Sequence, residues 1–314
     1  MLGMSDATAR NMIETHGLTK RYGARTAVDQ VDLAVPRACA YGFLGHNGAG
    51  KTTLIRMLLG LTSADAGTMR IAGHLVPAER SVALARVGAI VEEPAFHGHL
   101  TGRENLRVAA AVRGAAAAAR IDGVLERVGL GDRAGDRVGT YSQGMRQRLG
   151  VACCLLADPE LLILDEPLNG LDPGGILELR QMIRSLVAEG RTVFLSSHLL
   201  DEVEKTCDAA AVIDHGRIVE AGPIGTLMRR GTPELDLGCD QPERAIELLA
   251  EHPAVARVTR KSDEVRVTLV ADEGAADVNT SLVAAGVRVF RLAPVTESLE
   301  QRFLDLTAGR EERS

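Results

Sequence analysis

The sequence predicts an α/β fold, a parallel sheet covered by helices, followed by a small α+β domain. Over roughly the first 225 residues, strand-like runs alternate with helical ones. Two of these runs, LLIL (161–164) and TVFL (192–195), are apolar apart from Thr192, which is typical of parallel strands buried on both faces. The pattern changes at residues 228–234. We therefore expect one domain at 12–228 and an accessory α+β domain at 234–309.

The composition is that of a globular protein, with 46% hydrophobic and 25% charged residues among 314. We find neither a membrane-spanning run of ~18 apolar residues nor a secretion signal, and we expect a cytoplasmic protein. The net charge of −6 and the 3% of aromatic residues argue against nucleic-acid binding. The five cysteines are odd in number and lack C-x-x-C spacing, which indicates reduced thiols rather than disulfides or a zinc site.

The first elements follow from the alternation of apolar residues and from the glycines. Residues 31–35 alternate apolar positions with Asp32 and Ala34, which predicts an edge strand with one wet face. The run ACAYGFLG (38–45) predicts a strand that enters a glycine-rich turn, and KTTLIRMLLG (51–60) predicts the helix after it.

The region from Glu92 to Pro159 is predicted to be mostly helical, and Thr101 with Glu104 has the spacing of a capping box at a helix start. The accessory domain is predicted to contain strands at 235–239, 265–271 and 287–293 and helices at 242–252 and 276–286. In its last segment, 297–309, Leu299, Phe303 and Leu306 form an apolar stripe of helical spacing.

Residues 45–52, GHNGAGKT, fit the phosphate-loop pattern G-x-x-x-x-G-K-[ST] between a predicted strand and helix. The loop amides and the positive end of the helix favour phosphate, Lys51 can reach the β- and γ-phosphates, and the Thr52 hydroxyl can bind Mg²⁺. The alternative is a plain glycine turn. The sequence therefore predicts an ATP site whose loop residues are Gly45, Asn47, Gly48, Gly50, Lys51, Thr52 and Thr53.

Asp165 and Glu166 follow the buried run 161–164, where open α/β sheets bind their ligands. Two adjacent acids after four apolar residues are hard to explain by packing, although a strand end that simply turns polar is the alternative. We expect Asp165 to hold Mg²⁺, and Glu166 to orient and deprotonate an attacking water.

Four further segments lie before, between and after the phosphate loop and the Asp165–Glu166 pair. Tyr22 lies in LTKRYGARTAV, Ser142 and Gly144 lie in YSQGMRQRLG, Asp172 ends NGLD, and His198 lies in FLSSHLLDEVE. Together with the phosphate loop they resemble the motifs of ATP-binding cassette (ABC) ATPases, over residues 13 to about 225. The resemblance implies that Tyr22 stacks on adenine and that His198 contacts the γ-phosphate as a catalytic residue.

The resemblance also implies a homodimer, because in that family the signature segment of one subunit, here with Ser142 and Gly144, binds the ATP of the other. Asp172 matches the D-loop of that family, and the resemblance implies that it also belongs to the nucleotide site. Considered without its neighbours, Ser142 is a simple helix cap. The alternative for His198 is a core histidine at a strand end, although its place after the second buried strand favours a γ-phosphate contact. This chain departs from the family pattern at His46, usually proline, and at Gln143 and Met145. Glu92 stands where a glutamine that helps hold Mg²⁺ is usual, and we expect it to bind Mg²⁺ as a carboxylate.

The sequences around Glu92, IVEEPAF, and in the signature segment, YSQGMRQRLG, resemble those of the ATPases of bacitracin-type and lantibiotic self-protection exporters. The segment 297–309 resembles the end of the accessory domain of drug-exporter ATPases. We expect a cytoplasmic ATPase, peripheral on the inner face of the membrane, that works with a separate transmembrane permease subunit to export a peptide antibiotic or hydrophobic drug. Two alternatives stay open, a soluble ABC ATPase acting on ribosomes or DNA, and an importer ATPase with a regulatory C-terminal domain.

Overall fold

The computed structural model describes residues 11–228, 233–261, 264–271 and 274–295. The contacts divide the chain between Ile224 and Gly225 into two parts, which we call unit 1 and unit 2. The sequence-based boundary lies slightly further on, between residues 228 and 234. The segment 297–309 with its apolar stripe falls outside the described residues. Across the described ranges, no helix is both long and apolar enough to span a bilayer.

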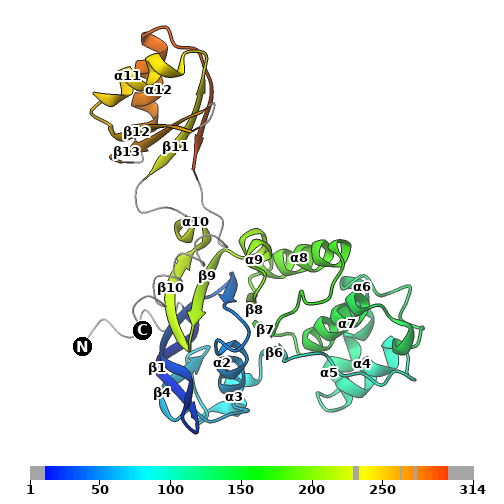
Figure 1. Ribbon diagram of the computed structural model, residues 1–314. Coiled ribbons are helices and arrows are strands. Elements are labelled where there is room, and N and C mark those ends of the chain that lie inside the picture. Colours follow the sequence, from blue (N-terminus) through cyan, green and yellow to red (C-terminus); the bar gives the residue numbers. More distant parts are fainter. Residues whose placement is uncertain (1–10, 229–232, 262–263, 272–273, 296–314) are drawn as a thin grey trace. The chain divides into compact units, whose positions relative to one another are not determined.

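An antiparallel sheet with the order β2-β1-β4-β5 forms one part of unit 1 (Figure 1). Its strands are β1 (Asn11–Tyr22), β2 (Arg25–Pro36), β4 (Ala66–Ile71) and β5 (His74–Val76). β2 lies at one edge of this sheet, and its Val31, Leu33 and Val35 are buried while the residues between them are exposed. The predicted edge strand with one wet face is therefore confirmed.

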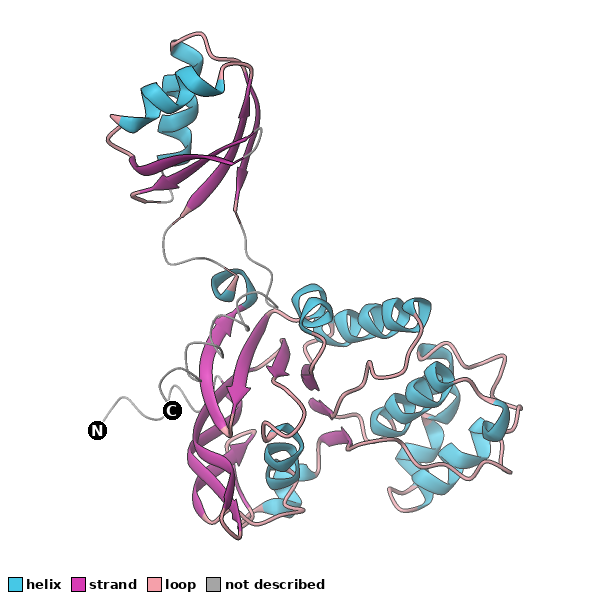
Figure 2. Cartoon of the chain, in the orientation of Figure 1, coloured by secondary structure: helices cyan, strands magenta, loops and turns pink. Residues whose placement is uncertain are grey.

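The second sheet of unit 1 is mostly parallel and has the order β10-β9-β3-β8-β7-β6 (Figure 2). Its strands are β3 (Ala40–Leu44), β6 (Val87–Ile90), β7 (Leu161–Leu164), β8 (Thr192–Ser197), β9 (Ala209–Asp214) and β10 (Arg217–Pro223). Only β9 and β10 pair antiparallel among these neighbours in the described chain. Every residue of β7 and β8 is buried, as predicted for parallel strands. The carboxyl ends of β3, β6, β7 and β8 consequently share one edge of the sheet.

The core of unit 1 lies between the two sheets and includes helix α2 (Lys51–Leu58). Leu54, Ile55 and Met57 of α2 are fully buried there. Across the parallel sheet, the rings of Phe43 and Phe194 pack with centroids 5.6 Å apart. This packing fixes the start of α2, and so the phosphate loop before it, against the sheet.

Helices fill the region between β6 and β7, as predicted, and a short helix that was not predicted follows β5. They are α3 (Arg80–Leu84), α4 (Gly102–Ala111), α5 (Ala115–Ala119), α6 (Ile121–Arg127) and α7 (Gln143–Leu155), and α8 (Pro173–Ala188) and α9 (Leu200–Thr206) come later. The capping box is confirmed, because the Thr101 hydroxyl accepts a hydrogen bond from the Glu104 amide and the Glu104 carboxylate accepts one from the Thr101 amide. In Figure 1, α4 to α7 form a cluster beyond β6, the edge strand of the parallel sheet.

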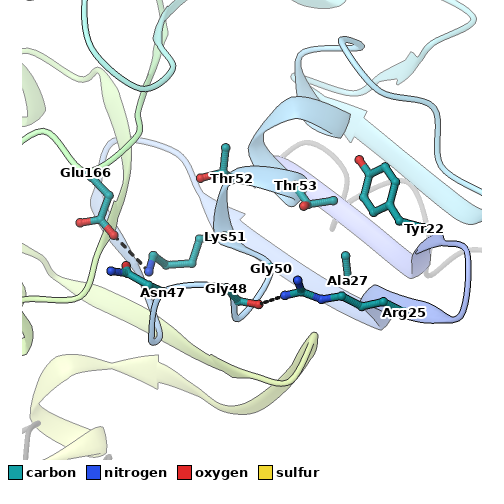
Figure 3. Close-up of a pocket in the computed structure, with 10 residues that line it drawn as sticks. All are labelled: Tyr22, Arg25, Ala27, Asn47, Gly48, Gly50, Lys51, Thr52, Thr53 and Glu166. Carbon is teal, nitrogen blue, oxygen red and sulfur yellow. Dashed lines mark hydrogen bonds and ion pairs between the residues drawn. The ribbon is translucent and has the colours of Figure 1, made fainter.

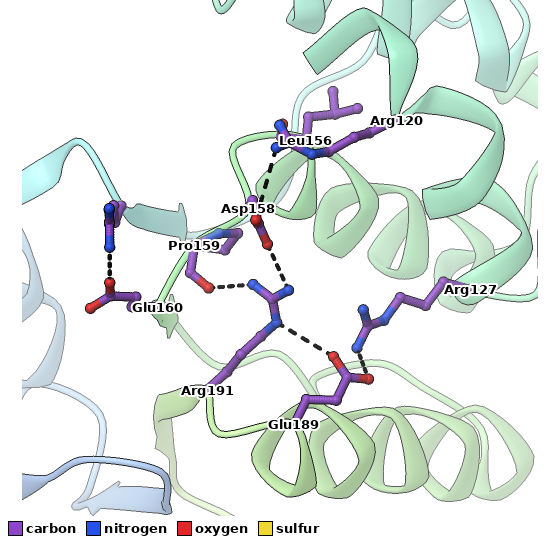
Figure 4. Close-up of polar contacts among 9 residues, drawn as sticks. Arg120, Arg127, Leu156, Asp158, Pro159, Glu160, Glu189 and Arg191 are labelled. Carbon is purple, nitrogen blue, oxygen red and sulfur yellow. Dashed lines mark hydrogen bonds and ion pairs between the residues drawn. The ribbon is translucent and has the colours of Figure 1, made fainter. Parts of the chain in front are cut away.

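Arg191 connects this helical cluster to the parallel sheet (Figure 4). Its guanidinium donates to Asp158 Oδ1 at 2.7 Å and to the Pro159 carbonyl at 2.5 Å, and its Nε lies 3.6 Å from Glu189. Glu189 in turn pairs with Arg127 of α6. The hydrogen bond from Arg191 lowers the pKa of the Asp158 carboxyl. The network therefore ties α6 to the turns that lead into β7 and β8, at the strand ends opposite the phosphate loop.

Unit 2 begins within the short helix α10 (Ile224–Leu227), and its described residues then form an antiparallel sheet with the order β12-β13-β11-β14 and helices α11 and α12. Its elements are β11 (Glu234–Cys239), α11 (Pro242–Ala250), β12 (Val255–Lys261), β13 (Glu264–Leu269), α12 (Gly274–Ala284) and β14 (Val289–Pro294). Leu249 of α11 and Leu282 of α12 are buried in one cluster with Val265 and Val267 of β13. This matches the predicted α+β pattern, except that the sequence analysis missed β12, whose residues VARVTRK carry three cations.

The five cysteines are all free thiols, as predicted. Burial raises the pKa of Cys39 to about 11 and that of Cys154 to about 12. Because the thiolate is the reactive form, these cysteines are inert core residues at neutral pH.

Candidate nucleotide-binding site

The glycine-rich turn between β3 and α2 has a conformation that requires glycine. Gly50 has φ +115°, and a Cβ there would lie 2.3 Å from the carbonyl oxygen of Ala27. A Cβ on Gly45 would lie 2.5 Å from the carbonyl oxygen of Ile213. The turn is therefore pressed against the neighbouring backbone, and its compact shape is fixed by sterics.

Lys51, the first residue of α2, lies in this turn with only 5% of its surface exposed. Its ammonium donates to the carbonyl oxygens of Gly45 at 2.6 Å and His46 at 3.2 Å, and it contacts Glu166 Oε1 at 3.0 Å. These partners are oxygen atoms, and a phosphate oxygen is chemically equivalent to them as a partner of the Lys51 ammonium.

A hollow of about 460 Å³ opens beside Lys51 (Figure 3). Glu166 and Lys51 lie at one end of it, and Tyr22, half-exposed, lies at the other with Arg25. The residues that line the hollow are Tyr22, Arg25, Ala27, Asn47, Gly48, Gly50, Lys51, Thr52, Thr53 and Glu166. The structure thus brings together most of the residues predicted to bind ATP, and Gly45 contributes through its carbonyl group. Arg25, which donates to the Gly48 carbonyl at 2.7 Å, was not predicted.

Asp165 and Thr52 meet at the end of β7. The Thr52 hydroxyl donates to Asp165 Oδ2 at 2.9 Å, and the Ser196 hydroxyl donates to Asp165 Oδ1 at 2.6 Å. Asp165 is 3% exposed, so both of its carboxylate oxygens are fixed by hydroxyl groups. Because Mg²⁺ prefers a few protein oxygens and takes its other ligands from phosphate and water, Thr52 and Asp165 fit the predicted ion. Ser196, two residues before His198, was not predicted as a site residue.

Glu166 is held between Lys51 and His198. Its Oε2 lies 2.9 Å from His198 Nδ1, its Oε1 contacts Lys51, and its amide donates to the Ser196 hydroxyl at 2.8 Å. Glu166 has φ +48°, a left-handed backbone conformation that is energetically costly for residues other than glycine. Such strain persists where the surroundings fix it and is concentrated at functional sites. The two predicted catalytic residues are therefore in direct contact at the edge of the hollow.

The predicted signature residues, Ser142 and Gly144, and the predicted D-loop residue Asp172 do not line the hollow beside Lys51. The Ser142 hydroxyl caps α7 by accepting from the Met145 amide at 3.2 Å, and Asp172 caps α8 by accepting from the Gly175 amide at 3.0 Å. In the single chain, Ser142 is thus the helix cap that its residue type allows.

A second hollow of about 230 Å³ adjoins the first at Thr52 and Glu166, and its residues are Thr52, Glu92, Glu93, Gln143, Gln147, Asp165, Glu166 and Asn169. Gln143 donates from Nε2 to the Asn169 carbonyl at 2.9 Å, a contact that the sequence did not predict. Glu92 belongs to this hollow, but its carboxylate pairs with Arg56 at 2.5 Å.

Comparison with known proteins identifies the kind of protein that carries such a site. Residues 28–169 match the family model described as ABC transporter. The chain is 41% identical over 301 residues to the bacitracin transport ATP-binding protein BcrA of Bacillus licheniformis, covering 95% of this chain and 98% of that one. It is 37% identical over 305 residues to the daunorubicin/doxorubicin resistance ATP-binding protein DrrA of Streptomyces peucetius, covering 94% of this chain and 92% of that one.

Among solved structures, an ATP-binding subunit of an ABC transporter aligns with a TM-score of 0.62 and 30% identity, over 69% of this chain and 92% of that one. The relatives in both comparisons thus agree on the fold and on the class of the site.

The steric argument at Gly50 makes a prediction about stability. Gly50→Ala adds a Cβ at a left-handed residue against the Ala27 backbone, and we expect a loss of about 2–4 kcal/mol of unfolding free energy together with loss of nucleotide binding. Gly123→Ala is the matched control, because Gly123 lies in α6 with open space around its Cβ position, and it should gain about 0.5–1 kcal/mol. Chemical denaturation of both variants measures the difference. Equal stability of Gly50→Ala and the unaltered chain would contradict this account of the turn.

Proposed function

This chain belongs to the ATP-binding subunits of the ABC transporter family, whose activity is ATP hydrolysis, and we propose that it energises an exporter. The observation that carries the proposal is the contact of Glu166 with both Lys51 and His198 beside the phosphate loop. An acid, a cation and a histidine in contact beside the phosphate loop support a site that binds and hydrolyses the triphosphate of ATP.

We propose that phosphate oxygens replace the Glu166 carboxylate as a partner of the Lys51 ammonium when ATP binds. Glu166 then stays beside His198 and can orient a water and accept its proton. Mg²⁺, held by Thr52 and Asp165, would neutralise charge that builds up on the phosphate oxygens. Tyr22 at the far end of the hollow offers its ring to the adenine base.

We propose a homodimer that binds two ATP molecules between its subunits. Ser142 opens α7 with free amides and the positive end of a 13-residue helix, an arrangement that attracts phosphate. A Cβ on Gly144 would meet only ordinary contacts, the nearest at 3.8 Å, so packing within one chain gives no reason for glycine there. Space left open beside a helix N-terminus supports the approach of a ligand carried by the other subunit.

The export direction and the partner are proposed from the relatives. Two relatives are named for bacitracin transport and for daunorubicin and doxorubicin resistance. We propose a separate transmembrane permease as partner, a peripheral position on the cytoplasmic face of the membrane, and a peptide antibiotic or hydrophobic drug as cargo. Deletion of residues 234–314 would separate a regulatory role of the accessory domain from a structural one: transport that persists without regulation supports the first, and loss of dimerisation supports the second.

The role of Glu166 predicts a separation of binding from hydrolysis. Glu166→Gln removes the proton acceptor and keeps the shape, so we expect ATP binding to persist while the rate of hydrolysis falls by about 10²–10⁴-fold. Equilibrium binding of a fluorescent ATP analogue and phosphate release measure the two quantities. If the variant hydrolyses ATP at the rate of the unaltered chain, Glu166 is not the base.

The homodimer predicts a change of mass. Light scattering of Glu166→Gln saturated with ATP and Mg²⁺ should give twice the 33.3 kDa of one chain, because bound ATP is not consumed. Ser142→Arg, which places a long cation at the proposed contact, should stay at the mass of one chain. A single-chain mass for Glu166→Gln itself would refute the ATP-bound dimer.

The partner is tested by co-purification. Tagged Glu166→Gln in ATP, recovered from detergent extracts of cells, should retain a polytopic membrane protein. Recovery of ribosomes or DNA in its place would instead support the soluble alternative.

A further inference from the structure

Glu92 and Glu166 occupy equivalent positions at the ends of neighbouring strands. In the parallel pair β6 and β7, Ile90 lies opposite Leu164, and each glutamate follows two residues later. Both glutamates have a left-handed backbone, with φ +61° at Glu92 and +48° at Glu166. Because this conformation is costly for a residue with a side chain, both turns must be held by contacts around them.

Both carboxylates contact a cation on the same helix, α2. Glu166 contacts Lys51 at 3.0 Å and Glu92 contacts Arg56 at 2.5 Å. Arg56 follows Thr52 by four residues and so lies on the same side of α2, one turn further on. Thr52 meets Asp165 after β7, and Arg56 meets Glu92 after β6. One face of α2 therefore supplies a partner to the end of each of these two strands.

The charge around the second hollow explains why Glu92 needs this partner. Glu92, Glu93, Asp165 and Glu166 all line it, beside the hollow where the triphosphate would lie. Each added negative charge near that site weakens the binding of a further anion by electrostatic repulsion. A glutamate at position 92 therefore opposes phosphate binding unless a cation compensates its charge.

We propose that Arg56 is a positioning residue of the nucleotide site, which compensates the charge of Glu92 and holds its carboxylate at the end of β6. The inference rests on the proposed function, since it concerns the affinity of the same site for ATP. It assigns the Arg56 side chain a role that the phosphate-loop pattern, which ends at Thr52, does not contain.

The test is ATP binding by the full chain in EDTA, where no Mg²⁺ masks the charge of the nucleotide. Arg56→Ala exposes the Glu92 charge, and we expect the Kd for ATP to rise roughly five-fold. Arg56→Lys and the double variant Arg56→Ala/Glu92→Gln should both stay within about two-fold of the unaltered chain, because the first keeps a cation beside Glu92 and the second removes the Glu92 charge. The defect of Arg56→Ala should shrink in high salt, since Arg56 and Glu92 are partly exposed.

Arg103→Ala is the matched control, because it also removes one cation from an exposed ion pair, with Asp122, and Arg103 lines neither hollow. Its Kd for ATP should not change. If the double variant keeps the defect of Arg56→Ala, or if Arg56→Ala binds ATP normally, charge compensation is refuted and the proposed function stands. Failure of the unaltered chain to bind ATP both in EDTA and with Mg²⁺ would refute both.

Discussion

The contact of Lys51 with Glu166 is the interaction on which the site depends. It joins the first residue of α2 to the end of β7, two elements more than a hundred residues apart in sequence. Both groups are largely buried, and a buried charge without a partner would be expensive. The pair can therefore open only when another charge takes its place. A triphosphate is a suitable replacement, since it brings negative charge to Lys51 and leaves Glu166 beside His198.

This contact exists because the strands are parallel and in a defined register. The carboxyl ends of β3, β6, β7 and β8 meet at one edge, and each contributes polar residues there, from the phosphate loop to His198. Ser196, near the end of β8, connects β8 to the end of β7, because its hydroxyl donates to Asp165 and accepts from the Glu166 amide. A shift of one residue between β7 and β8 would break both bonds. Packing of the buried strands, rather than the polar residues themselves, therefore sets the geometry of the site.

The sequence predicted those features that depend on neighbouring residues. Apolar runs marked β7 and β8, and the capping box at Thr101 follows from a local pattern. Features that depend on register could not be predicted. The contact of Arg56 with Glu92 requires knowing which residue follows β6 beside α2, and no short pattern contains both. Strand β12 was missed for a different reason, since its three cations lower the apolar signal that the core-facing Val255 and Val258 provide.

Three of the departures from the family pattern, at Glu92, Gln143 and His46, are accounted for by local contacts in this structure. The Glu92 carboxylate contacts Arg56, and the Gln143 side chain donates to the Asn169 carbonyl and fills the space over Gly170. At position 46 the contact with Lys51 is made by the backbone carbonyl, which a proline would also provide. The first two departures thus add contacts and the third leaves the Lys51 contact unchanged. A substitution at such a site is accommodated when it brings its own partner, because unpaired polar groups near buried charges weaken both folding and ligand binding.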